Sequence, residues 1–145
     1  MTLLSGVRSR LHHVGFVVAD IEASMPRFVQ SLGGTWNGKV IFDPCQNVKV
    51  AFLSTHPMQP QIELVGASQV DGPVTRFLEQ KGEGLHHLCY EVADLDVSLG
   101  IAKKNGMLLA KPPKPAVAFD GRRIAWVLTP EKMLIELLEA GGTTS

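Results

Sequence analysis

The chain of 145 residues lacks the features that would direct it to nucleic acid, to a membrane or to an oxidising compartment. Its 14 Lys and Arg balance 14 Asp and Glu, which argues against a chain that coats nucleic acid or an anionic membrane. It has only two cysteines, Cys45 and Cys89, without a CxxC spacing, so a reducing compartment is the simpler assumption. The opening MTLLSGVRSR holds too short an apolar run for a signal peptide, and no stretch approaches the length of a membrane span. We therefore expect a soluble cytoplasmic protein with no nucleic-acid or membrane partner.

The most informative feature that is present is an internal repeat. LHHVGFVVADIEAS (11–24) and LHHLCYEVADLDVS (85–98) are identical at seven of fourteen positions when the chain is shifted by 74 residues. VAFLST (50–55) faces IAWVLT (124–129) at the same shift, and IELV (62–65) faces IELL (135–138) after one deletion. Two blocks that match in the same order indicate an internal duplication.

Each half has the same pattern of predicted elements. An apolar strand precedes an Asp that caps a helix, Asp20 or Asp94, and the helices end before Gly33-Gly34 and Asn105-Gly106. Three strands follow in each half, at 38–42, 48–54 and 61–66 and at 108–112, 122–128 and 133–139, with a hairpin turn at Asp120-Gly121. The pattern predicts an α+β protein made of two βαβββ modules, at about 10–68 and 84–140. A short helix at about 71–82, capped by Asp71, joins them within one domain spanning 1–145.

Four of the repeated residues are polar side chains in apolar strands: His13 with His87, and Glu63 with Glu136. A carboxylate buried there without a partner is costly. If a pseudo-twofold axis relates the halves, the four side chains can converge, and two imidazoles and two carboxylates suit a divalent metal such as Zn, Ni, Co, Mn or Fe. The alternative is that each Glu pairs with a nearby Arg and each His is hydrogen-bonded in the core. Because the four residues stand at duplicated positions, we favour the metal site.

Strand alternation lets only one histidine of each pair face such a site. If His13 faces it, His12 points the other way, and His86 relates to His87 in the same manner. Cys89, two residues after His87, is expected on the same face as a buried small hydrophobe. The aromatic residues are expected to line the site or the core without a predicted stacking site: Trp36, Phe52, Phe119 and Trp126.

These motifs resemble the vicinal oxygen chelate superfamily and, within it, the methylmalonyl-CoA epimerase family. The likeness runs from LHHVGFVVADIEAS through VKVAFL and QIELVGAS to RRIAWVLTP and LIELLE. FLEQKGEGLHH is the most specific part, since it belongs to the linker and the duplication does not explain it. The resemblance implies paired modules that form an open, cup-shaped, eight-stranded mixed sheet around one divalent metal ion, with His13, Glu63, His87 and Glu136 as ligands. It also implies a homodimer.

The activity that the resemblance implies is proton abstraction next to the carbonyl of an acyl thioester, such as a CoA ester. Glu136 is expected to be one catalytic base, and epimerisation needs a second. Some epimerases carry that second Glu at a place that falls on Val50 here, so Glu63 would have to serve instead, by leaving the metal. The alternatives are a glyoxalase-like lyase of the same superfamily and a non-catalytic protein that binds a small ligand.

The segment AKPPKPAVAFDGRR (110–123) concentrates basic side chains near the second module's strands. Lys111, Lys114, Arg122 and Arg123 are candidates to contact the phosphates of a CoA or another carrier. The alternative is a solvated loop that its prolines stiffen.

Overall fold

The computed structural model describes residues 2–4, 7–68 and 72–141. The chain divides into two compact units, which we call the N-terminal unit (His13–His86) and the C-terminal unit (Met1–His12 with His87–Ser145). Strands β2 (Val7–Val17) and β7 (Gly84–Val92) each contribute residues to both units. Among the described residues, the helices are too short and too polar to cross a membrane.

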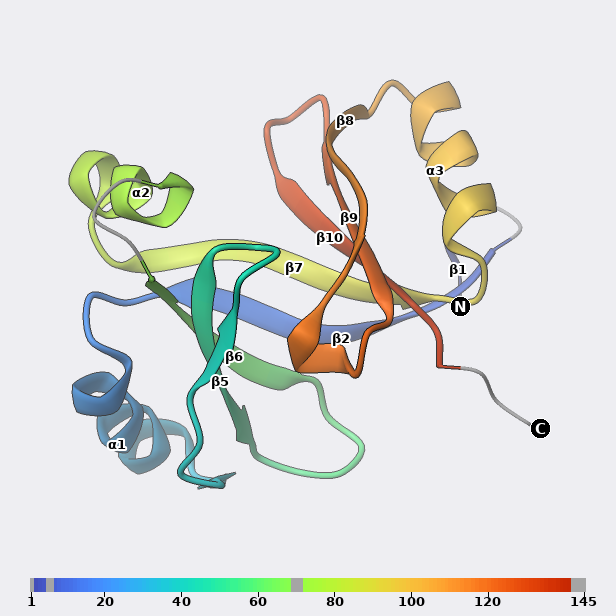
Figure 1. The fold of residues 1–145 in the computed structure, drawn as a ribbon. Helices are drawn as coiled ribbons and strands as arrows, with labels where there is room; N and C mark the ends of the chain where they lie inside the picture. The colour runs from blue at the N-terminus through green and yellow to red at the C-terminus, as the bar shows by residue number, and fades with distance from the viewer. Residues whose placement is uncertain (1, 5–6, 69–71, 142–145) are drawn as a thin grey trace. The chain divides into compact units, whose positions relative to one another are not determined.

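The N-terminal unit is a small mixed sheet with helices against it (Figure 1). Its strands lie in the order β3 (Thr35–Trp36), β5 (Val48–Ser54), β6 (Gln61–Ala67) and β2, and β4 (Ile41–Asp43) pairs with β5. β2 and β6 are parallel, whereas the other pairs are antiparallel. Helix α1 (Ile21–Leu32) contacts β3, β5 and β6, and α2 (Pro73–Lys81) contacts β6.

Local signals set the limits of α1. The Asp20 carboxylate accepts a hydrogen bond from the Ala23 N–H at 3.1 Å, which satisfies a donor of the first turn. The helix ends at Gly33, where φ is 76° and the N–H donates to the Val29 carbonyl at 2.8 Å. The inner side of α1 packs on one face of the sheet, in a core made of Val18, Ile21, Met25, Ala51, Leu53 and Leu64. The opposite face of that sheet is therefore left for other side chains.

The C-terminal unit repeats this topology. Its strands lie in the order β7, β10 (Leu134–Glu139), β9 (Arg123–Leu128) and β8 (Leu108–Pro115), and only the β7–β10 pair is parallel. Asp94 caps α3 (Leu95–Lys104) by accepting from the Val97 N–H at 3.0 Å. The helix covers one face of the sheet, where the core comprises Val7, Val92, Leu95, Ala102, Ala125, Val127, Ile135 and Leu137. A 3₁₀ turn, η1 (Val117–Phe119), connects β8 to β9, and β1 (Thr2–Leu4) pairs with β2.

The predicted α+β class and the repeated βαβββ pattern are confirmed, with differences at the ends of elements. The sequence pattern does not predict the short strands β1 and β3, and β8 continues past residue 112 to Pro115. Asp120 and Gly121 form the predicted turn, with φ of 55° and 82°, but η1 precedes it. The N-cap of α2 is Gly72, and the predicted cap Asp71 lies outside the described residues. The organisation of 1–145 as one domain stays a prediction.

Candidate functional site

In the N-terminal unit, a buried histidine and a buried glutamate lie side by side on the sheet face that α1 leaves open. Gly15 of β2 is the register partner of Glu63 on β6, and His13 is two residues before Gly15 on the same face. The Nε2 atom of His13 lies 3.4 Å from Oε1 of Glu63. The two residues are 0% and 4% exposed, so both polar groups are withdrawn from water.

The C-terminal unit contains the same arrangement. Cys89 of β7 is the register partner of Glu136 on β10, and His87 is two residues before Cys89. The Nε2 atom of His87 lies 3.2 Å from Oε1 of Glu136, and both residues are buried. Each unit by itself thus brings together the His and the Glu that the sequence repeat singles out.

An aromatic ring completes each pair. Phe52 and Trp126 were expected to line the site or the core, and each lies edge-on to one of the two histidines. Phe52 is the cross-strand partner of Glu63, and its ring meets the His13 imidazole edge-on at 5.8 Å between centroids. Trp126 is the partner of Glu136 and meets His87 edge-on at 4.7 Å. The shift of 74 residues aligns Phe52 with Trp126. A ring edge that packs on the imidazole limits its rotation.

The remaining histidines of the two HH motifs contact other rings. His12 lies edge-on to Phe119 in the C-terminal unit, at 5.4 Å. His86 lies edge-on to Phe77 of α2 in the N-terminal unit, at 5.1 Å. Because side chains alternate along a strand, the second histidine of each motif lies beside a glutamate. The first histidine instead packs against a phenylalanine.

The donor atoms of the two pairs fit a divalent metal. Each pair offers an imidazole nitrogen and a carboxylate oxygen, which are ligand types that Zn and other first-row divalent ions accept. A buried carboxylate needs a compensating positive charge or hydrogen bonds. The alternative expectation was an arginine beside each of these glutamates. Arg10 and Arg122 instead bind Glu91, and Arg123 binds Glu139 and Asp96.

Val50 lies on the same face as Glu63 and carries no proton acceptor. It pairs with Val65, two residues after Glu63, and stands two residues before Phe52 on β5. Its side chain is buried, whereas the neighbouring Lys49 is exposed and alternates to the other face. The position expected for a second acid is thus an apolar part of the sheet.

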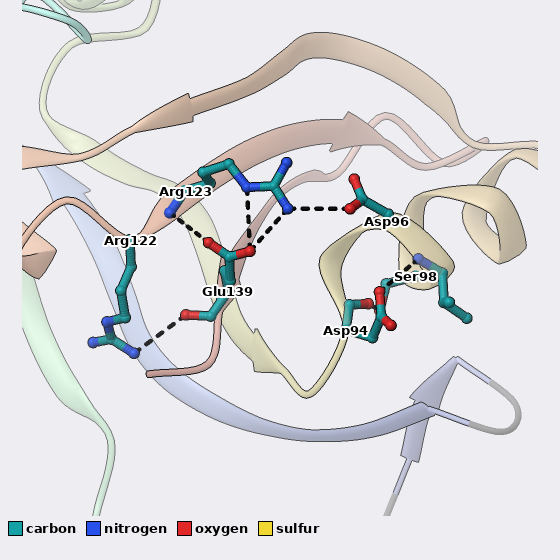
Figure 2. Close-up of polar contacts among 7 residues, drawn as sticks. Asp94, Asp96, Ser98, Arg122, Arg123 and Glu139 are labelled. Carbon is teal, nitrogen blue, oxygen red and sulfur yellow. Dashed lines mark hydrogen bonds and ion pairs between the residues drawn. The ribbon is translucent and has the colours of Figure 1, made fainter. Parts of the chain in front are cut away.

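Figure 2 shows where the arginines of segment 110–123 lie. The Arg123 guanidinium binds Oε1 of Glu139 through Nη2 at 2.8 Å and Oδ2 of Asp96 at 3.1 Å. Arg122 binds Oε2 of Glu91 through Nη1 at 2.6 Å. Both arginines are therefore held by acidic groups of their own unit.

These contacts shift the pKa values of the carboxyl groups. The hydrogen bonds from Arg123 hold the pKa of Glu139 below its ordinary value. Burial raises the pKa of Glu91, but the hydrogen bonds from Arg10 and Arg122 outweigh it, so the net shift is downward. The Arg123 pKa is raised by its hydrogen bonds to Glu139 and Asp96.

Comparison with known proteins identifies the family. Residues 12–126 match the sequence model of the Glyoxalase/Bleomycin resistance protein/Dioxygenase superfamily, and the chain belongs to this superfamily. Among individual proteins, it is 30% identical over 119 residues to the ethylmalonyl-CoA/methylmalonyl-CoA epimerase of Cereibacter sphaeroides, covering 81% of this chain and 87% of the relative. It is 29% identical to the uncharacterized protein YqjC of Bacillus subtilis, covering 92% of this chain and 94% of the relative.

A solved structure shares the fold. The methylmalonyl-CoA epimerase of Streptomyces coelicolor, in complex with 2-nitronate-propionyl-CoA, superposes with a TM-score of 0.78. The match covers 92% of this chain and 98% of the other, at 22% identity. The expected fold family is thus confirmed.

Proposed function

We propose that the chain is a metal-dependent isomerase that removes the proton next to the carbonyl of an acyl thioester, with methylmalonyl-CoA as substrate. The observation that carries this proposal is the buried His–Glu pair that recurs at the same register in each unit. The similarity to the epimerase of C. sphaeroides supports the substrate class. Cytoplasmic location and assembly as a homodimer are parts of the same prediction.

The proposed ligands of one divalent ion are His13, Glu63, His87 and Glu136, contributed in equal number by the two units, which together would form one domain. The ion would be Zn, Ni, Co, Mn or Fe, since the same nitrogen and oxygen donors suit all of these. When bound, such an ion supplies electrophilic stabilisation of the negative charge that develops on the thioester oxygen.

Glu136 is the proposed base. Its carboxylate is buried beside His87 and Trp126, so little water competes for the proton that it removes from the α-carbon. Epimerisation then requires a proton donor on the opposite side of the planar intermediate. Val50 offers none, and Glu63 is the carboxylate of the N-terminal unit's pair. We assign it this second role, in which it would leave the metal and act as the protonated acid.

Deuterium exchange tests the reaction directly. Methylmalonyl-CoA is incubated in D₂O with protein that has been stripped of metal and reloaded with each ion in turn, and NMR follows loss of the α-proton signal. The proposal expects exchange that depends on added metal. Absence of exchange with every ion would reject it.

The apolar Val50 favours one second candidate, a glyoxalase-like lyase. A reaction that moves a proton between neighbouring carbons on one face of an intermediate needs a single base, and Glu136 alone would provide it. Turnover of the hemithioacetal of glutathione, together with no exchange on methylmalonyl-CoA, would select this candidate. A protein that neither turns over a substrate nor shows a thermal shift with any metal would be the non-catalytic binder.

A further inference from the structure

The edge strand β8 of the C-terminal unit carries two lysines at unusual register positions. Lys111 pairs with Trp126 of β9, and Lys114 pairs with Ile124. Lysines three residues apart in a regular strand would point to opposite faces. Here the register shifts between Lys111 and Lys114, so three steps along β8 correspond to two along β9. An extra residue in one strand of a pair changes the direction of the side chains that follow.

A second shift brings Lys111 to this face. Leu109 pairs with Val127, whose side chain belongs to the core beneath α3, whereas Lys111 pairs with the next residue back, Trp126. Residues that are direct cross-strand partners share a face. The two register shifts, one between Leu109 and Lys111 and one between Lys111 and Lys114, therefore place both lysines on the face that carries Trp126, Glu136 and His87.

Their charges are available. Lys111 and Lys114 are exposed, and neither makes a hydrogen bond or ion pair within the described part of the chain. The arginines of the same segment differ, because Arg122 and Arg123 are bound to Glu91 and Glu139 at 2.6 and 2.8 Å. The four basic residues of the segment therefore differ. Arg122 and Arg123 are held by carboxylates. Lys111 and Lys114 make no such contact with a described residue.

The positions suit the distal part of a thioester substrate. Lys111 is two strands away from Glu136, about 10 Å between Cα atoms at the usual strand spacing, and Lys114 is about 12 Å away. The sheet face between them and Glu136 carries the half-buried Trp126 and the buried Ile124 of β9. An apolar path that leads from a buried carboxylate to two free ammonium groups matches a substrate whose reacting end is joined by a neutral arm to phosphates.

We propose that Lys111 and Lys114 bind the phosphate groups of the CoA portion of the substrate. Flexible lysines bind phosphate as point charges, so they suit a carrier whose phosphates lie at the solvent-exposed edge of the sheet. Pro112, Pro113 and Pro115 stiffen β8, and they cannot donate backbone hydrogen bonds to a further strand. The edge thus stays open to a small ligand. This inference deepens the proposed function and rests on it for the choice of substrate.

Equilibrium binding, measured separately from catalysis, tests the inference. Calorimetry on the full chain compares CoA, dephospho-CoA and pantetheine, the last of which has no phosphate. The double variant Lys111→Ala/Lys114→Ala is expected to bind CoA roughly five- to tenfold more weakly, as suits two exposed ion pairs, and to bind pantetheine unchanged. Added salt should reduce the difference.

The matched control is Lys103→Ala/Lys104→Ala, which removes the same charge from the end of α3, on the other side of this sheet. It should bind CoA as the wild type does, and Lys111→Arg/Lys114→Arg should restore binding. Unchanged CoA affinity in the alanine double variant, an equal loss for pantetheine, or no CoA binding by the wild type would overturn the inference. Wild-type protein that binds CoA in the expected way but exchanges no α-proton would instead reject the proposed reaction alone.

Discussion

Glu136 lies directly opposite Trp126 on neighbouring antiparallel strands, and the Trp126 indole packs edge-on against the imidazole of His87. The Nε2 atom of that imidazole is 3.2 Å from the Glu136 carboxylate. Acid, imidazole and ring therefore hold one another in place within one unit. The same three-part contact forms from Glu63, Phe52 and His13 in the other unit.

Substituting the two glutamates separates their proposed roles. Glu136→Gln keeps the size of the side chain but removes the proton acceptor, so α-proton exchange should fall at least about 100-fold. Glu63→Gln should retain exchange on one epimer of methylmalonyl-CoA and lose epimerisation. NMR in D₂O with each pure epimer measures both, and Glu79→Gln on the exposed side of α2 is the control. If Glu136→Gln exchanged the α-proton as fast as the wild type, Glu136 would not be the base.

The edge-on aromatic contact predicts a positioning role for Trp126. Trp126→Ala frees the His87 imidazole, so metal affinity should fall by about tenfold, which is typical when a group that orients a ligand is removed. Trp126→Phe keeps a ring edge against the imidazole and should restore most of the affinity. Competition with a chelator gives the metal Kd, and circular dichroism checks that the variants fold. Equal affinities in the wild type and the alanine variant would leave Trp126 with a packing role only.

The Arg123–Glu139 contact predicts how stability depends on pH. Because the pKa of Glu139 is lower in the folded chain than in the unfolded one, its contribution is fully present above the unfolded value of about 4.3. It is lost as the pH falls through the lower folded value. Glu139→Gln should therefore lower the free energy of unfolding by about 1 kcal/mol at pH 7, as expected for a partly exposed ion pair, and by less at pH 3.

Urea unfolding from pH 3 to pH 7 checks this dependence. The same titration of Asp120→Asn, an exposed acid for which no ion pair with a described residue is found, is the control. A difference between wild type and Glu139→Gln that stays constant with pH would contradict the assignment.

The turn after α1 predicts a position that tolerates only glycine. Gly34 has φ of 95°, and a Cβ atom there would lie 2.4 Å from the Ser54 carbonyl oxygen of β5. Gly34→Ala should therefore lower the free energy of unfolding by more than the roughly 1–2 kcal/mol that a left-handed conformation alone costs a non-glycine residue. Gly38 has φ of 80° and open space around it, so Gly38→Ala should show the conformational cost only. Similar unfolding free energies for the two variants would contradict this prediction, because they would show that the backbone near Ser54 moves enough to accommodate the added Cβ atom.

Local patterns made much of the fold predictable from the sequence. Asp20 and Asp94 cap their helices because a side-chain oxygen three residues before a backbone N–H suffices for that bond. The duplication then pointed to each His–Glu pair, since equivalent residues of the two halves take equivalent places. The arginine contacts were not predictable, because Arg122 and Glu91 are 31 residues apart and meet only through the sheet. The register shifts before and after Lys111 were not predictable either, because they depend on how β8 pairs with β9.

The central claim is that the two His–Glu pairs serve one metal ion, and the metal content of the purified protein tests it most directly. Wild-type chain dialysed against each candidate ion and analysed by mass spectrometry should retain one ion per chain. His13→Ala and His87→Ala should each lose that ion, although they alter different units, while circular dichroism shows that both remain folded. Two ions per chain, or a single variant that keeps its full metal content, would contradict the account.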